Sequence, residues 1–139
     1  MEVPVGGGSD ATRVSSYNPW VSMYWLTVGK TVGGLQLYNE TRLSRETALE
    51  LYTRGSAWFS QEQQKKGDIK VGMFADLAVL DNDYFNVEDE AVKNIEAEMT
   101  VVDGKIVYAK GDFSSFSPPT IPILPCLLYT SDAADEEDS

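Results

Sequence analysis

The sequence predicts an α+β fold in which a short strand and two helices precede a small antiparallel sheet. Helical periodicity begins at the cap-like pair Asn18-Pro19 and returns over residues 44–58. Further along, the pattern changes to strand alternation, and an Asp-Gly pair at 103–104 indicates a hairpin. We therefore divide the chain into residues 1–62 and residues 63–112, and neither part contains a complete sheet.

Composition places few limits on function. The chain has 139 residues, 42% hydrophobic and 24% charged, which is enough for one core, and it contains no apolar run as long as a membrane-spanning helix. The net charge of −11 argues against nucleic acid and anionic membranes as partners. With a single cysteine, Cys126, the redox compartment cannot be inferred, and localisation is left open with the cytoplasm as the default.

The C-terminal residues 126–139 are interpreted apart from the fold. They hold five acids and no base, so that residues 1–125 carry a charge of −6, which is −11 with five acids removed. The string "CLLYTSDAADE" resembles the in-frame translation of a transposon-type sequencing adapter, so we expect read-through sequence without ordered structure. The alternative is a genuine acidic, disordered terminus. Residues 113–125 carry four prolines and are expected to be extended and poorly packed.

The first part begins with Val3-Pro4-Val5, which suits a short edge strand, and continues into a loop rich in glycine and serine. Asn18 is the expected N-cap of a helix of about three turns that starts at Pro19 and ends at Gly29. A second helix over 44–58 would begin at Ser44 and contain Gly55 as a weak point.

The second part has strand character. "ADLAVLD" at residues 75–81 alternates as a half-buried strand does, and "NVEDEAVKNIE" at residues 86–96 can form a short helix. The segment "AEMTVVDGKIVYAKG", residues 97–111, predicts a β-hairpin with a type I′ turn at Asp103-Gly104.

Two nucleotide-binding patterns are incomplete. Gly6, Gly8 and Ala11 fit G-x-G-x-x-A, but no helix is expected to start there, and the position of the expected acid is Lys30. "VGKT" at 28–31 lacks the first glycine of a P-loop, because that position is Tyr24. A third feature is the set of tryptophans, which could stack on a ligand but at helical spacing more often pack in a core; these are Trp20, Trp25 and Trp58.

Asp10 is the main candidate for chemistry, in the stretch "VPVGGGSDA". On local spacing alone, an aspartate after glycines is more often a turn residue that bonds its own backbone. However, "GSDA", then "KG-x-I-x-x-G-x-x-ADL-x-VLD", then "V-x-G-K-x-VY" occur here in one order. Together they resemble the closing segment of a metal-dependent amidohydrolase of amidohydrolase family 3, the group containing N-substituted formamide deformylases. The resemblance covers about residues 2–125.

This resemblance implies an α/β fold. Residues 1–62 would be the last strand and the following helices of a (β/α)8 barrel, with Val3–Val5 as the eighth strand, and residues 63–112 would be part of the flanking β-sandwich. Asp10 would then lie at the C-terminal end of that strand, where barrel active sites are built. The missing N-terminal barrel segment would be encoded upstream.

The same resemblance implies roles for side chains. Asp10 would contact a divalent metal, Zn²⁺ at one or two sites, and would accept a proton from the attacking water. The other ligands in the family include a His-x-His pair, whereas this chain contains no histidine, so we expect no metal bound to this chain alone and no activity from it. The substrate of the full-length enzyme would be a small amide-type molecule. Arg13 is the candidate for substrate contact; Ser16, Tyr17 and Asn18 could line the pocket or simply pack the loop.

The alternative is a non-catalytic α+β module that binds a protein partner. Four large apolar residues have no obvious sheet to cover and could present an exposed surface; they are Trp20, Trp25, Leu49 and Trp58.

Overall fold

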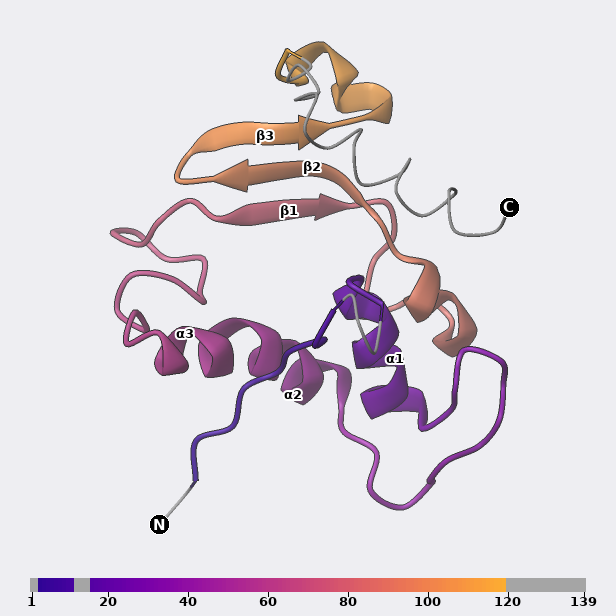
Figure 1. Ribbon diagram of the computed structural model, residues 1–139. Helices are drawn as coiled ribbons and strands as arrows, with labels where there is room; N and C mark the ends of the chain where they lie inside the picture. Colours follow the sequence, from indigo (N-terminus) through magenta and orange to yellow (C-terminus); the bar gives the residue numbers. More distant parts are fainter. Residues whose placement is uncertain (1–2, 12–15, 120–139) are drawn as a thin grey trace, which may run out of the picture.

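A computed structural model describes residues 3–11 and 16–119. It contains a layer of helices below a three-stranded antiparallel sheet (Figure 1). Within the described residues, every helix is too short or too polar to cross a membrane.

Helix α1, Pro19–Val28, has the bounds that its end residues predict. The Asn18 side chain accepts a hydrogen bond from Trp20 N at 2.9 Å, and Pro19 occupies the first turn, where its missing N–H costs nothing. Gly29 ends the helix with φ 73°, a left-handed conformation that glycine adopts without steric strain, and its N–H donates to Trp25 O at 3.0 Å. The predicted first helix is therefore confirmed.

The second helix is also confirmed, but its centre is not regular. Ser44 caps α2, Arg45–Glu50, by accepting a hydrogen bond from Thr47 N at 3.1 Å. The chain then passes through a π-helical turn, η1, Leu51–Gly55, before α3, Ser56–Phe59. A π-turn contains one residue more than an α-turn and exposes backbone groups that an α-helix would pair. Gly55, the residue expected to weaken the helix, is thus the last residue of the π-helical turn.

The sheet consists of β1, Leu77–Leu80, β2, Ala97–Val102, and β3, Lys105–Ala109, in the order β1-β2-β3. The hairpin prediction is confirmed, because Asp103 and Gly104 have φ values of 50° and 73°. The short helix expected before the hairpin is a 3₁₀ helix, η2, Asp89–Asn94.

Two expectations about local structure are wrong. Val3–Val5 form no strand, and no strand among the described residues lies beside them to supply the pairing that a strand requires. Residues 113–116 are not extended, because they belong to a 3₁₀ helix, η3, Gly111–Phe116. The prolines of this region start only at Pro118, so the preceding residues are free to turn. Residues 120–139, including the adapter-like segment, lie outside the described residues.

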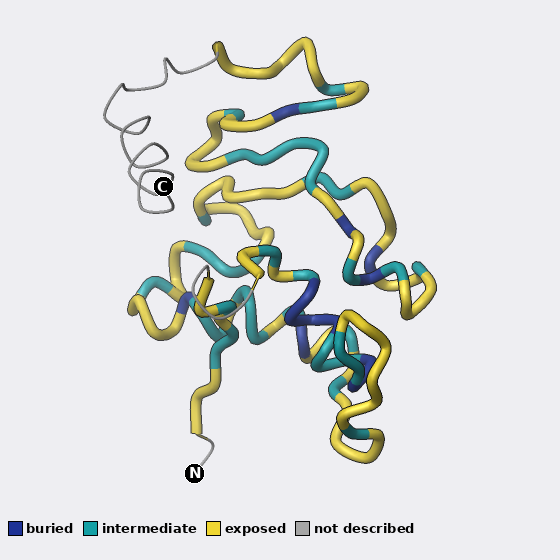
Figure 2. Tube along the Cα trace, turned by 45° about the vertical axis from the view of Figure 1, so that its right-hand side comes forward, coloured by how far each residue is buried: buried dark blue, intermediate teal, exposed yellow. Residues whose placement is uncertain are grey.

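The core joins the two parts of the chain. Its fully or nearly fully buried members come from α1 and α2 and from the segment between β1 and β2 (Figure 2). They are Met23, Tyr24, Val28, Ala48, Tyr84, Val92 and Ile95. Trp20, Trp25 and Leu49 pack against this cluster, so the apolar surface expected at these three residues is largely covered, whereas Trp58 stays 47% exposed.

The fully buried Ile95 gives a direct test of this core. We expect Ile95→Ala to lower the free energy of unfolding by about 2–5 kcal/mol, since it removes buried methylene groups and leaves a cavity. Val32→Ala, at a loop residue that is 52% exposed, is the control and should change it by less than about 0.5 kcal/mol. Urea denaturation followed by tryptophan fluorescence measures both, and equal effects would contradict the assignment of the core.

Candidate active-site loop

The glycine-rich segment that leads to Asp10 crosses the second helix (Figure 1). Gly7 N donates a hydrogen bond to Leu51 O at 2.8 Å. The Ser56 hydroxyl lies 2.9 Å from Gly7 O and 3.0 Å from Leu51 O, and it donates to both carbonyls. The segment is therefore anchored to the helix at the π-turn, three residues before Asp10.

Asp10 itself is exposed and has φ 50°. Aspartate is one of the few residues other than glycine that adopt this left-handed conformation, and such positions often occur where a side chain must be aimed. The loop thus presents a carboxylate to the surface just beyond an anchored backbone. That geometry suits a group that exchanges a proton with a molecule from outside the chain.

The residues after Asp10 are only partly described. Arg13, the candidate for substrate contact, lies outside the described residues. Ser16 Oγ accepts a hydrogen bond from Asn18 N at 3.1 Å, and Asn18 caps α1. Tyr17 is 78% exposed. Ser16 and Asn18 therefore form the N-terminal cap region of α1. Of the two roles expected for these side chains, lining a pocket or packing the loop, this geometry favours packing.

The described residues do not fit a metal centre. They contain no group of three or more histidine, cysteine, aspartate or glutamate side chains placed to hold an ion. The chain also has no histidine, and a zinc ion normally takes three or four protein ligands. Asp10 could supply one ligand at most, so no step of a reaction can be derived through a metal held by this chain.

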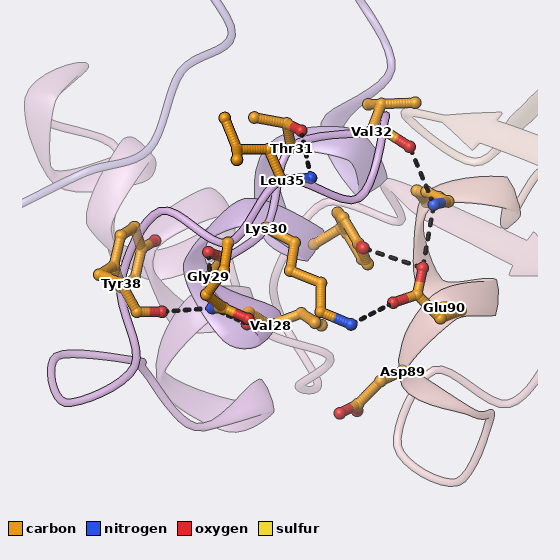
Figure 3. Close-up of polar contacts among 12 residues, drawn as sticks. Val28, Gly29, Lys30, Thr31, Val32, Leu35, Tyr38, Asp89 and Glu90 are labelled. Carbon is orange, nitrogen blue, oxygen red and sulfur yellow. Dashed lines mark hydrogen bonds and ion pairs between the residues drawn. The ribbon is translucent and has the colours of Figure 1, made fainter.

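A second polar cluster, centred on Glu90, joins η2 to α1 and its following loop (Figure 3). The Glu90 carboxylate lies 2.8 Å from Lys30 Nζ, 3.1 Å from Lys93 Nζ and 2.9 Å from the Tyr24 hydroxyl, which donates to it. Lys93 also donates to Val32 O at 3.2 Å. We call these contacts the Glu90 cluster.

The Glu90 cluster changes the titration of its members. Hydrogen bonds from Lys30, Lys93 and Tyr24 lower the pKa of Glu90 to about 2. Burial, together with the hydrogen bond to the Glu90 carboxylate, raises the pKa of Tyr24. Both pKa shifts follow from burial and contacts in the folded chain. Glu90, Lys30 and Lys93 are already paired with one another as ions, and Tyr24 donates its hydroxyl hydrogen to Glu90. We therefore interpret the cluster as a structural link.

Arg45 forms a second link between the same parts of the chain. Its guanidinium donates to Tyr84 O and Val87 O, both at 2.6 Å, and pairs with Asp89 Oδ1 at 2.9 Å. In return, the Tyr84 hydroxyl donates to Arg45 O at 3.0 Å. Burial raises the pKa of Tyr84 to about 12, so this hydroxyl keeps its proton and remains a donor.

An open groove of about 1200 Å³ lies between the helices and the sheet. Its apolar lining comes from both layers and comprises Trp20, Met23, Leu49, Tyr52, Ile69, Phe74, Leu77, Leu80, Tyr84 and Phe85. Asp10 is not among its lining residues. This groove is thus separate from the candidate carboxylate, and its apolar walls suit packing against another surface better than catalysis.

Residues 1–108 match the model of the amidohydrolase family. This chain belongs to the amidohydrolase family. The resemblance inferred from the ordered motifs is therefore confirmed at the level of the family.

Curated relatives of this amidohydrolase chain are all much longer. It is 38% identical over 74 residues, 52% of this chain and 14% of the relative, to a protein of Bacillus subtilis (strain 168) named amidohydrolase YtcJ. It is 27% identical over 95 residues, 68% of this chain and 18% of the relative, to N-substituted formamide deformylase of Arthrobacter pascens.

A third relative is 5-methylthioadenosine/S-adenosylhomocysteine deaminase of Clostridium tetani (strain Massachusetts / E88), 30% identical over 122 residues, 81% of this chain and 28% of the relative. The amidohydrolase chain thus spans less than a third of the length of these relatives. No solved structure gives a significant match.

Sequence reasoning about the amidohydrolase chain missed the residues that hold the Asp10 loop. The sequence marks Gly55 only as a weak point in a helix and does not single out Ser56. A glycine inside a helical pattern can have a packing reason, so the local sign of the crossing is faint. In contrast, the contacts of Glu90 with Tyr24 and Lys30 and those of Arg45 bridge 39 to 66 positions along the chain, and no local pattern indicates them.

The Glu90 cluster predicts a specific dependence of stability on pH. Because the pKa of Glu90 falls in the folded state from an ordinary 4.5 to about 2, its contribution to stability is complete above pH 4.5 and is lost as the pH falls towards 2. Glu90→Gln should therefore unfold at lower urea concentration than the wild type at pH 7, with the difference shrinking at pH 3.

Glu88→Gln, an exposed glutamate two positions away, is the matched control and should show no such narrowing. A gap between Glu90→Gln and the wild type that stays constant from pH 7 to pH 3 would contradict the role assigned to Glu90.

Proposed function

We propose that this chain is the C-terminal part of a hydrolase that cleaves a non-peptide C–N bond, of the amide or formamide class, in a small molecule. The family match over residues 1–108 carries this proposal. Two of the relatives support the bond type, since a deformylase and a deaminase both act at a carbon–nitrogen bond. The Asp10 loop supplies an exposed carboxylate in the "GSDA" motif, the first of the ordered motifs.

In this proposal, residues 1–62 are the last strand position and helices of a (β/α)8 barrel, and residues 63–112 are part of a flanking β-sandwich. The antiparallel sheet β1-β2-β3 is consistent with a piece of a sandwich, and the short coverage of the relatives is consistent with a barrel that lies elsewhere in the full-length protein. Active sites of such barrels are built from loops at the C-terminal ends of the strands, where Asp10 would lie.

The proposed role of Asp10 is that of a general base and then a general acid. Its carboxylate accepts a proton from water while the water oxygen bonds to the carbonyl carbon. It then gives this proton to the nitrogen as the C–N bond breaks, so that the products are an amine and a carboxylic acid. A carboxylate is suited to both steps because it is restored at the end.

We further propose that the full-length enzyme requires a divalent metal, Zn²⁺ at one or two sites, to activate water. The described residues contain no group that could form the site, so in this proposal the remaining ligands come from sequence upstream of this chain, and the chain alone is expected to be inactive.

The groove between helices and sheet favours a second candidate function, an α+β module that binds a protein partner through apolar contacts. The two candidates differ in the behaviour of the chain alone. A cooperative, protease-resistant monomer that binds little hydrophobic dye favours the module. A chain that is readily digested and binds the dye favours a part that needs the rest of its enzyme.

Replacing Asp10 tests the catalytic proposal. In the full-length enzyme, Asp10→Asn should lower kcat/KM on N-substituted formamides by about 10²–10⁴-fold, because the amide cannot take up the proton. Asp76→Asn is the control: Asp76 Oδ1 accepts a hydrogen bond from Asp103 N at 2.8 Å, and an amide oxygen can do the same. Full activity in Asp10→Asn would remove Asp10 from the reaction.

The origin of the metal ligands gives a separate test. We expect the DNA upstream of residue 1 to encode a His-x-His pair in frame, and we expect the 139-residue chain to show no tight zinc binding by isothermal titration. Sub-micromolar zinc affinity of the chain alone, or an upstream frame without the pair, would contradict the proposal.

A further inference from the structure

The hydroxyl of Ser56 connects two backbones that are far apart in sequence. It lies 2.9 Å from Gly7 O and 3.0 Å from Leu51 O, so its single proton is shared between the two carbonyls. A helical serine commonly donates to a carbonyl one turn earlier in its own helix. That habit accounts for the contact with Leu51, but not for the contact with Gly7, which lies 49 positions away.

The contact between Ser56 and Gly7 lies at the π-helical turn. In this turn, Leu51 O accepts the Gly7 N–H at 2.8 Å in addition to the serine hydroxyl. Gly7 is thus held through both of its backbone polar groups, its N–H by Leu51 and its carbonyl by Ser56. We call these three hydrogen bonds the Gly7 clamp.

The approach of the two segments is close enough to exclude side chains at specific positions. A Cβ on Gly7 would lie 2.5 Å from the Tyr52 ring, and a Cβ on Gly55 would lie 2.4 Å from Val5 O, whereas a Cβ on Gly8 would meet nothing within 4 Å. Gly7 and Gly55, on the two sides of the crossing, therefore both require the absence of a side chain, whereas Gly8 does not and provides a matched control for Gly7.

We propose that Ser56 is a positioning residue that acts through the Gly7 clamp to fix the loop bearing Asp10. The inference rests on the proposed function of Asp10. Only two residues separate the clamped Gly7 from Asp10, and the Asp10 backbone is in a left-handed conformation, so freeing Gly7 would let the carboxylate move. A misplacement of about 1 Å at a reacting group lowers the rate by on the order of 100-fold.

The test compares Ser56→Ala with Ser56→Thr in the full-length enzyme. Ser56→Ala removes the donor, while threonine retains a hydroxyl that can still bond in a helix. In Ser56→Ala we expect backbone amides of residues 3–11 to exchange hydrogen roughly fivefold faster, kcat on N-substituted formamides to fall by about 10- to 100-fold, and KM to stay within about twofold. Ser56→Thr should restore both the exchange rate and kcat.

Gly7→Ala and Gly8→Ala provide a second pair. Gly7→Ala should act like Ser56→Ala, because its methyl group collides with Tyr52, and Gly8→Ala should behave as the wild type. The inference is overturned if exchange at residues 3–11 is unchanged in Ser56→Ala. It is also overturned if exchange rises throughout the protein and Ser56→Thr fails to rescue kcat, since Ser56 would then support only overall stability.

Asp10→Asn separates this inference from the proposed function. If Asp10→Asn is inactive while Ser56→Ala has normal kcat, the positioning role is wrong and the function of Asp10 stands. If Asp10→Asn is fully active, the proposed function is wrong and the positioning role fails with it. Faster exchange at residues 3–11 in Ser56→Ala would then show that the clamp exists as a structural contact alone.

Discussion

The carbonyl group of Leu51 is the contact point between the N-terminal glycine-rich segment and the helix that follows Ser44. It accepts hydrogen bonds from Gly7 N and from the Ser56 hydroxyl at the π-helical turn. These bonds hold the segment that leads to Asp10 against the helix. Gly7 and Gly55 lie where the two segments approach too closely for a side chain.

The remaining structure is held together by contacts that join the two parts of the chain. Tyr24 from α1 and Ile95 from the segment after η2 are fully buried in one cluster. Beside this cluster, Glu90 pairs with Lys30 and Lys93 and accepts a hydrogen bond from Tyr24. Arg45 donates to the carbonyls of Tyr84 and Val87. These contacts fix the helices that hold the Asp10 loop against the segment between β1 and β2. The open groove lies between the helices and the strands themselves.

The features that were predictable from sequence are those determined by neighbouring residues. Asn18, Pro19 and Gly29 mark the ends of a helix, because capping residues and prolines act within one turn. Asp103-Gly104 closes a hairpin, because few residue pairs can adopt a positive φ at both positions. The strand expected at Val3–Val5 was wrong, since strand character is realised only beside a pairing partner.

The candidate site divides in the same way. Asp10 could be singled out because its motif, "GSDA", and two further motifs occur in the order typical of the family, and the family match confirms that resemblance. Ser56 and the π-turn could not, because their role depends on a segment 49 positions earlier in the chain. Long-range pairing of this kind leaves only a faint local trace, here the glycine and serine within a helical pattern.

In the reaction proposed for the full-length enzyme, the anchored loop directs the Asp10 carboxylate at the water molecule that attacks the carbonyl carbon of the C–N bond. The most direct measurement is a crystal structure of the full-length enzyme with an inhibitor that mimics the tetrahedral intermediate. We expect an Asp10 carboxylate oxygen to lie about 2.6–3.2 Å from the inhibitor oxygen that replaces the water, with the bond from Gly7 N to Leu51 O retained. An Asp10 side chain turned away from a correctly bound inhibitor would contradict the account.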